Sequence, residues 1–88
     1  MRLYIILDKT AQKVRAQFNA ENHEVAIRRC KAELLTTKEL QLDAINQELY
    51  CIGGIQDTTG TLIPEEEKQY LINYEQIMIN LEGKTNVL

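Results

Sequence analysis

Hydrophobic and polar residues alternate along the first twenty positions in a pattern that predicts two neighbouring β-strands. Residues 2–7 are apolar on both faces, which is typical of a strand in the interior of a sheet. Residues 13–19 alternate cleanly between apolar and polar side chains, as expected for a strand with one solvent-exposed face. We predict a hairpin around residues 8–12 whose register places Leu7 opposite Val14, Ile5 opposite Ala16, and Leu3 opposite Phe18.

This register gives the hairpin two unlike faces. The apolar side chains of the second strand gather on the face of the first strand that carries Leu3 and Ile5. The opposite face carries Arg2, Tyr4 and Arg15, so we predict a basic and partly aromatic surface there.

Residues 21–35 follow the 3.6-residue period of an amphipathic helix, with Asn19 or Asn22 available as the N-cap. Its apolar stripe consists of Val25, Ala26, Ile27, Cys30 and Leu34. We expect this helix to cover the sheet face that bears Leu3, Ile5, Leu7, Val14 and Phe18.

The segment that follows permits a short second helix. Thr36 and Glu39 have the spacing of a capping box, which favours a helix through about Ile45. In that helix Leu40, Ala44 and Ile45 would face inward.

Residues 48–63 are predicted to form a second hairpin that turns at residues 57–60. Asp57 can accept backbone hydrogen bonds at the start of the turn, and Gly60 supplies a left-handed conformation at its end. The glycines at 53–54 indicate a β-bulge or a close approach of two backbones. A phosphate-binding loop is disfavoured, because neither a lysine nor a helix N-terminus follows these glycines.

Helix signals bracket the C-terminal part of the chain. Pro64 suits a first helical position, residues 65–67 place three glutamates in a first turn, and Gly83 suits a helix end, so we predict a helix over residues 64–82. This helix has more apolar width than one small sheet requires, which indicates either deeper burial in its own domain or a dimer contact. The candidate dimer residues are Tyr70, Tyr74, Ile77, Met78 and Leu81.

Together these elements predict an α+β fold of order ββαββα, in which a small antiparallel sheet of two hairpins packs with helices. The chain has 88 residues, of which 44% are hydrophobic, and this is enough for one hydrophobic core and too little for two. We therefore expect a single domain over residues 1–83 with a tail over residues 84–88, and we exclude a multidomain enzyme.

The sequence also limits where the protein works. No apolar run approaches the roughly 20 residues of a membrane span, and the apolar start of the chain meets Asp8 too early for a signal-peptide core. We therefore expect a cytoplasmic protein with no membrane partner. Cys30 and Cys51 lie among aliphatic residues, which predicts reduced thiols in the core.

Catalysis finds little support in the sequence. The chain has no serine and one histidine, His23, and neither cysteine lies in a local sequence signature of an activated thiol. Consecutive glutamates in a helix point in different directions, so residues 65–67 suit a helix start better than a metal site. We expect no enzymatic activity, no metal site and no cofactor.

The net charge of -3 is distributed unevenly. Residues 1–38 carry eight cationic and four acidic side chains, a net charge of +4, whereas residues 39–88 carry two and nine, a net charge of -7. A basic half of the chain can bind a polyanion, or it can contact the acidic patch of a partner subunit. The plainer interpretation is that these charged side chains only keep the surface solvated.

Binding of single-stranded nucleic acid requires cations for the phosphates and flat side chains for the bases. The candidate residues are Arg2, Tyr4, Lys9, Lys13, Arg15, Arg28, Arg29 and Lys31. Tyr4 has an alternative role, because it becomes a core residue if the C-terminal helix packs on its side of the sheet.

Several motifs resemble one known family. They are Met1-Arg2-Leu3-Tyr4 with Asp8-Lys9, then Phe18-Asn19-Ala20-Glu21-Asn22 leading to Val25-Ala26-Ile27-Arg28, and Leu49-Tyr50-Cys51-Ile52-Gly53 followed by Asp57-Thr58-Thr59-Gly60. Over roughly residues 1–63 the chain is similar to the small non-structural protein of gokushoviruses, which are single-stranded DNA phages of the Microviridae.

This resemblance implies a protein made in the cytoplasm of the infected bacterium and absent from the virion. It implies DNA binding that assists the switch from duplex replication to single-strand synthesis for packaging, and it brings no catalytic residues. The alternative hypothesis is a dimeric interaction or assembly module that acts on phage or host proteins, including replication proteins.

Overall fold

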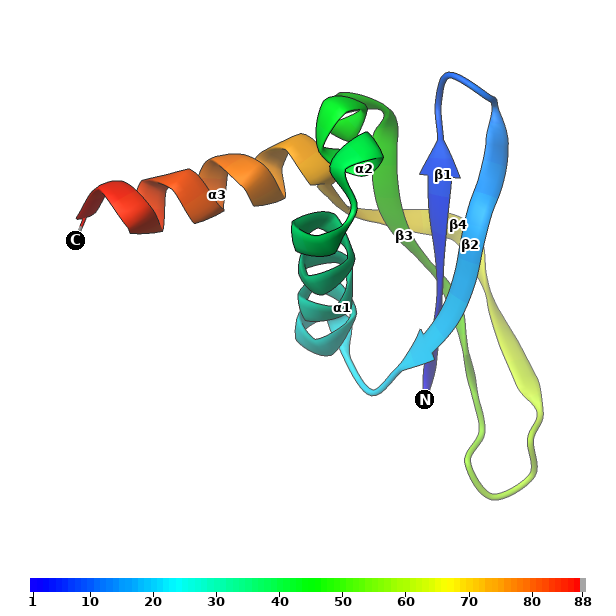
Figure 1. The fold of residues 1–88 in the computed structure, drawn as a ribbon. Coiled ribbons are helices and arrows are strands. Elements are labelled where there is room, and N and C mark those ends of the chain that lie inside the picture. The colour runs from blue at the N-terminus through cyan, green and yellow to red at the C-terminus, as the bar shows by residue number, and fades with distance from the viewer. Residues whose placement is uncertain (88) are drawn as a thin grey trace.

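The computed structural model describes residues 1–87, with side chains as far as Leu81. One antiparallel sheet holds four strands in the order β2-β1-β3-β4 (Figure 1). Its strands are β1 (Arg2–Asp8), β2 (Lys13–Ala20), β3 (Gln47–Ile55) and β4 (Leu62–Asn73). The helices are α1 (His23–Thr36), α2 (Lys38–Leu42) and α3 (Tyr74–Val87), with a 3-10 turn at Ala44–Asn46. The α+β class and the order ββαββα are therefore confirmed.

The helices lie on one side of the sheet, and α3 runs away from its edge (Figure 1). The core fills the space between this side and the helices. It contains Tyr4, Ile6, Phe18, Ala20, Leu49 and Cys51 from the sheet, and Ala26, Cys30, Leu34, Ala44, Tyr74 and Ile77 from the other elements. We call this side the helix-covered face. The opposite side, which carries Leu3, Ile5, Tyr50 and Tyr70, is the outer face.

The predicted register of the first hairpin is correct at one end and wrong at the other. Leu7 pairs with Val14 as predicted, but Ile6 pairs with Ala16 and Tyr4 with Phe18. The shift arises because Arg15 is an extra residue in β2, a β-bulge that moves the remaining pairs by one position.

The bulge changes which face of the sheet the helices cover. Phe18 now shares a face with Tyr4 and Ile6, and the prediction that α1 covers the Leu3 and Ile5 face is wrong. Burial of Tyr4 is tolerated because its hydroxyl has a partner, the Nδ1 atom of His23, at 2.9 Å.

The largest correction concerns Pro64 and the three glutamates after it. These residues lie in strand β4, and the predicted helix over 64–82 is wrong in its first half, residues 64–73. Pro64 pairs with Gly53 on an edge strand, the position in a sheet where proline is tolerated. Four residues of β4, residues 65–68, stand opposite a single residue of β3, Ile52, and so form a large bulge. The glutamate side chains in this bulge are exposed to solvent.

Helix α3 begins only at Tyr74, where Asn73 provides the start signal. The Asn73 Oδ1 atom accepts a hydrogen bond of 2.7 Å from the Glu75 backbone N–H, as an N-cap side chain does. The helix continues to Val87, beyond its predicted end near Gly83. The division into a domain of residues 1–83 and a tail stays a prediction, and Leu88 lies outside the described residues.

Helix α1 agrees with the sequence interpretation. Asn22 is the N-cap, and its Oδ1 atom accepts a 2.9 Å hydrogen bond from the Val25 N–H. The stripe residues Ala26, Cys30 and Leu34 are buried.

The predicted second helix is only partly correct. Helix α2 is short, and the Thr36 hydroxyl donates back to the carbonyls of Ala32 and Glu33 instead of forming a capping box. Ala44 is buried, but Ile45 is 54% exposed and does not face inward as predicted.

The glycines of the second hairpin behave as predicted. A Cβ atom on Gly53, whose φ is +157°, would lie 2.5 Å from the Ile63 carbonyl oxygen, so two backbones meet closely there. Gly60 has a φ of +73° in the turn and donates a 2.7 Å hydrogen bond to the Gln56 carbonyl. Asp57 has a role that the sequence does not predict, because its Oδ1 atom binds the N-terminal ammonium at 3.0 Å.

Candidate nucleic-acid interface

Arg15 is the centre of a polar network under the helices. Its guanidinium donates two hydrogen bonds, of 3.0 and 3.1 Å, to the Glu33 carboxylate and a third, of 2.7 Å, to Gln47 Oε1. Tyr74 completes the network by donating a 2.7 Å hydrogen bond from its hydroxyl to Glu33. The hydrogen bonds with Arg15 lower the pKa of Glu33, and those with Glu33 raise the pKa of Arg15. Arg15 therefore joins β2 to α1, β3 and α3, and little of its charge remains for a ligand.

Tyr4 is fully buried and cannot stack on a base. Its ring stacks on Phe18 with 5.6 Å between centroids, and burial raises the pKa of its hydroxyl. The prediction of an exposed basic and aromatic face around Tyr4 is wrong. The alternative interpretation of Tyr4 as a core residue is confirmed.

Exposed cations of the predicted set lie on both β2 and α1, and we call the part of the molecule formed by these two elements the α1–β2 edge. Lys13 and Arg29 are exposed, and the Arg29 guanidinium lies 4.5 Å from the centroid of the Phe18 ring. A hollow of about 70 Å³ lies beside Arg29, whereas Lys13 pairs with Asp8 at the start of β2 and does not line it. Its lining residues are Ile6, Ala16, Gln17, Phe18, Arg29, Cys30 and Glu33. This edge therefore offers positive charge next to a small recess.

The other predicted cations are dispersed. Lys9 lies 3.7 Å from a Glu48 carboxylate oxygen, and the exposed Arg28 lies 3.5 Å from that of Glu24. Arg2 is exposed at the start of β1. The structure therefore does not join all eight predicted residues into one track.

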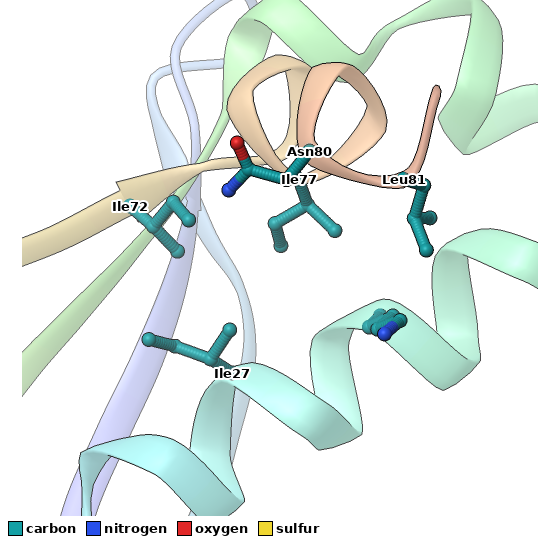
Figure 2. Close-up of a pocket in the computed structure, with 6 residues that line it drawn as sticks. Ile27, Ile72, Ile77, Asn80 and Leu81 are labelled. Carbon is teal, nitrogen blue, oxygen red and sulfur yellow. The ribbon is translucent and has the colours of Figure 1, made fainter. Parts of the chain in front are cut away.

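Lys31 lies in a different place, a groove between α1 and α3. Figure 2 shows Ile27, Ile72 and Ile77 converging on this hollow, whose volume is about 140 Å³. Asn80 and Leu81 complete the lining. The groove is mainly apolar, and Lys31 is its cationic side chain.

The outer face holds two aromatic residues that were not assigned from the sequence to nucleic-acid binding; Tyr70 was a candidate for the dimer contact instead. Tyr50 and Tyr70 are directly paired across β3 and β4, with 5.6 Å between ring centroids and an interplanar angle of 69°. The Lys68 ammonium lies 5.3 Å from the centroid of Tyr50, and Tyr70 is 51% exposed. The signal that could have found them is the spacing of Lys68 and Tyr70, which are two positions apart and so share one face of a strand, but the helix assignment concealed it.

The candidate dimer residues occupy different environments. Tyr74 and Ile77 are buried in the core of their own chain, so they are unsuitable for a dimer contact, and the alternative of deeper burial is confirmed for them. Met78 and Leu81 are half-buried on α3, and Tyr70 lies on the sheet.

Cys30 and Cys51 are free and buried, as predicted. Burial raises the pKa of Cys30, which keeps this thiol protonated and unreactive. Within the described residues, no group of three or more His, Cys, Asp or Glu side chains could hold a metal ion, and no helix is long and apolar enough to cross a membrane.

Comparison with known proteins gives one family. Residues 1–77 match the family model described as Phage ORF5 protein. No curated protein and no solved structure matches the chain.

Proposed function

Because the chain belongs to the Phage ORF5 protein family, we propose that it is a non-enzymatic accessory protein of a single-stranded DNA phage that binds single-stranded DNA. In this proposal it works in the cytoplasm of the host bacterium and assists the switch from duplex replication to single-strand synthesis for packaging. The resemblance to the small non-structural protein of gokushoviruses supports the phage type and the step in replication.

The observation that carries the proposal is the cationic α1–β2 edge. Lys13 on β2 and Arg29 on α1 are exposed, and so is Arg2 at the start of β1. Cations in such an arrangement neutralise phosphates and release counterions, which favours DNA binding at low salt. The acidic half of the chain opposes this attraction over long distances, so we expect moderate affinity with a strong dependence on salt.

Binding of single-stranded DNA measured across a series of salt concentrations tests the proposal. Replacing Lys13 and Arg29 together by glutamine should weaken binding and reduce the slope of log K against log salt by about 0.7 for each lost phosphate contact. Lys38→Gln is the matched control, because Lys38 is an exposed lysine on α2 outside the α1–β2 edge. Absence of binding at low salt, or binding that salt does not affect, would contradict the proposal.

A second candidate function is a dimeric assembly module for phage or host proteins. The observation that favours it is a set of exposed apolar side chains on the helices, namely Leu35 (59%), Leu42 (82%) and Ile79 (50%). Exposed apolar groups of this kind favour association with another protein surface.

Light scattering on the full chain tests this second function. If α3 forms the contact, the wild-type protein should have twice the monomer mass and Ile79→Gln should reduce it to the monomer. Ile45→Gln removes an equally exposed isoleucine from outside the helices α1 to α3 and should leave the mass unchanged. A monomeric wild-type protein at all concentrations would remove this candidate.

A further inference from the structure

We propose that the outer face of the sheet stacks the bases of single-stranded DNA on Tyr50 and Tyr70, with Lys68 contacting an adjacent phosphate. The inference rests on the proposed function, and it assigns base contact to a surface on the opposite side of the sheet from the one that the sequence predicts.

The position of the two tyrosines follows from strand alternation. Leu49 and Cys51 point into the core and are fully buried, so Tyr50 between them points to the outer face. Tyr70 pairs directly with Tyr50, and their rings are in contact. Ile5 is the neighbour of Tyr50 on the other side. The two rings therefore lie next to the apolar side chains of β1 on the outer face, Leu3 and Ile5.

This face is separate from the hydrophobic core. Leu3 and Ile5 are each less than 10% exposed, yet neither belongs to the core cluster that the helices cover. Tyr70 keeps half of its surface accessible to solvent. The half-exposed Tyr70 ring, with the partly buried Tyr50 ring beside it, provides a surface on which a flat, partly apolar group can lie.

The two rings differ in freedom. The Tyr50 hydroxyl donates a 2.9 Å hydrogen bond to Glu48, which orients the ring, and the Lys68 ammonium lies against it. Tyr70 has the larger exposed surface, so it is the first platform for a base, and Tyr50 becomes available when Lys68 turns from the ring toward a phosphate. A cation that already lies beside an aromatic ring matches a ligand that alternates anionic and planar groups.

A single strand fits this surface better than a duplex does. In a duplex each base is covered by its stacked neighbours, and exposing one costs a few kcal/mol. A single strand presents its bases without that cost. Every base has a flat face, so stacking on tyrosine tolerates any sequence, as a replication accessory protein requires.

The outer face also connects with the cationic edge. Neighbouring strands lie about 4.8 Å apart, so the path from β4 across β3 and β1 to β2 is roughly 14 Å, a distance that two or three nucleotides can span. Gln17 and Asn19 are exposed on β2 and alternate with the inward-facing Phe18, so they offer amide groups along this path. A strand stacked on the tyrosines therefore reaches the α1–β2 edge.

Binding of a short oligothymidylate, measured by fluorescence anisotropy at low salt, tests the inference. Tyr70→Leu should weaken binding by about 10-fold, and Tyr70→Phe, which keeps the ring, should bind within about twofold of the wild type. The tyrosine fluorescence of the wild type should fall on binding, because a stacked base quenches it. Competition with duplex DNA of equal length should be weaker than competition with the single strand.

The outcomes separate the two proposals. If the wild type binds and Tyr70→Leu binds equally well, the stacking site is overturned and the proposed function stands. If the wild type does not bind single strands at low salt, both are overturned. If light scattering shows that Tyr70→Leu converts a dimer into a monomer, the outer face contacts a second copy of the chain and the stacking site is overturned.

Discussion

At the scale of single residues, Gly53 shows how one position determines the path of a strand. Its φ of +157° is unfavourable for residues with a side chain, and the Pro64 backbone lies 3.0 Å from where a Cβ atom would stand. The two backbones meet at the point where β4 begins to bulge, so this glycine allows β4 to stay paired with β3 on both sides of the bulge.

Gly53→Ala should therefore lower the free energy of unfolding by about 3 kcal/mol, because it combines backbone strain with a steric clash. Gly60→Ala is the matched control. Gly60 also has a positive φ, but no atom lies within 4 Å of an added Cβ, so the expected loss is only about 1 kcal/mol. Urea denaturation of both variants measures the difference, and equal losses would contradict the steric argument.

At the scale of elements, the Arg15 network determines how the helices sit on the sheet. One guanidinium binds Glu33 of α1 and Gln47 of β3, and it also lies within 3.3 Å of the Tyr74 hydroxyl of α3. The bulge in β2 makes this possible. In a regular strand two adjacent side chains point to opposite faces, but at the bulge both Arg15 and its neighbour Ala16 face the helices.

The network predicts a loss of stability in acid. The pKa of Glu33 is lower in the folded protein than in the unfolded chain, so its contribution is complete above the unfolded pKa of about 4.3 and is lost as the pH falls through the folded pKa. Glu33→Gln should lower stability at neutral pH by on the order of 1 kcal/mol and should flatten the acid limb.

The measurement is urea denaturation between neutral pH and the acid limb. Glu24→Gln is the matched control, since Glu24 is 83% exposed in its pair with Arg28 and should contribute only a few tenths of a kcal/mol. Some dependence on pH should persist in Glu33→Gln, because the backbone hydrogen bond from Ala11 also lowers the pKa of Asp8. An unchanged acid limb in Glu33→Gln would refute the role of the network.

Some helices and strands were predictable from the sequence and others were not. Helix α1 was predicted because its period and its Asn22 cap lie in one local segment. Strand β4 was missed from Pro64 onward because Pro64 and the glutamates favour a helix start locally, whereas pairing with β3 decides the outcome. Ala16 and Phe18 were placed on the wrong face because no local pattern announces a bulge of one residue, and Arg15 was expected to be exposed because the helices were assigned to the opposite face.

At the scale of the whole molecule, the uneven charge of the sequence does not become a single basic surface. Arg15 is neutralised within the fold, and Lys9 and Arg28 each lie beside a carboxylate. Which cations remain available depends on contacts between distant segments, and composition contains no information about those contacts. The fold class was predictable because it needs only the order of elements, whereas the candidate site needs the faces and registers.

The bulge of β4 has a consequence for how copies of the protein behave toward one another. A long strand at the open border of a sheet is a template on which another molecule can add its own border strand, and repetition of that step builds fibres. Here Pro64 and the carboxylates at 65–67 interrupt the edge strand. The carboxylates of two such edge strands repel each other, which opposes backbone pairing between them. We therefore expect the protein not to polymerise through β4 at high concentration.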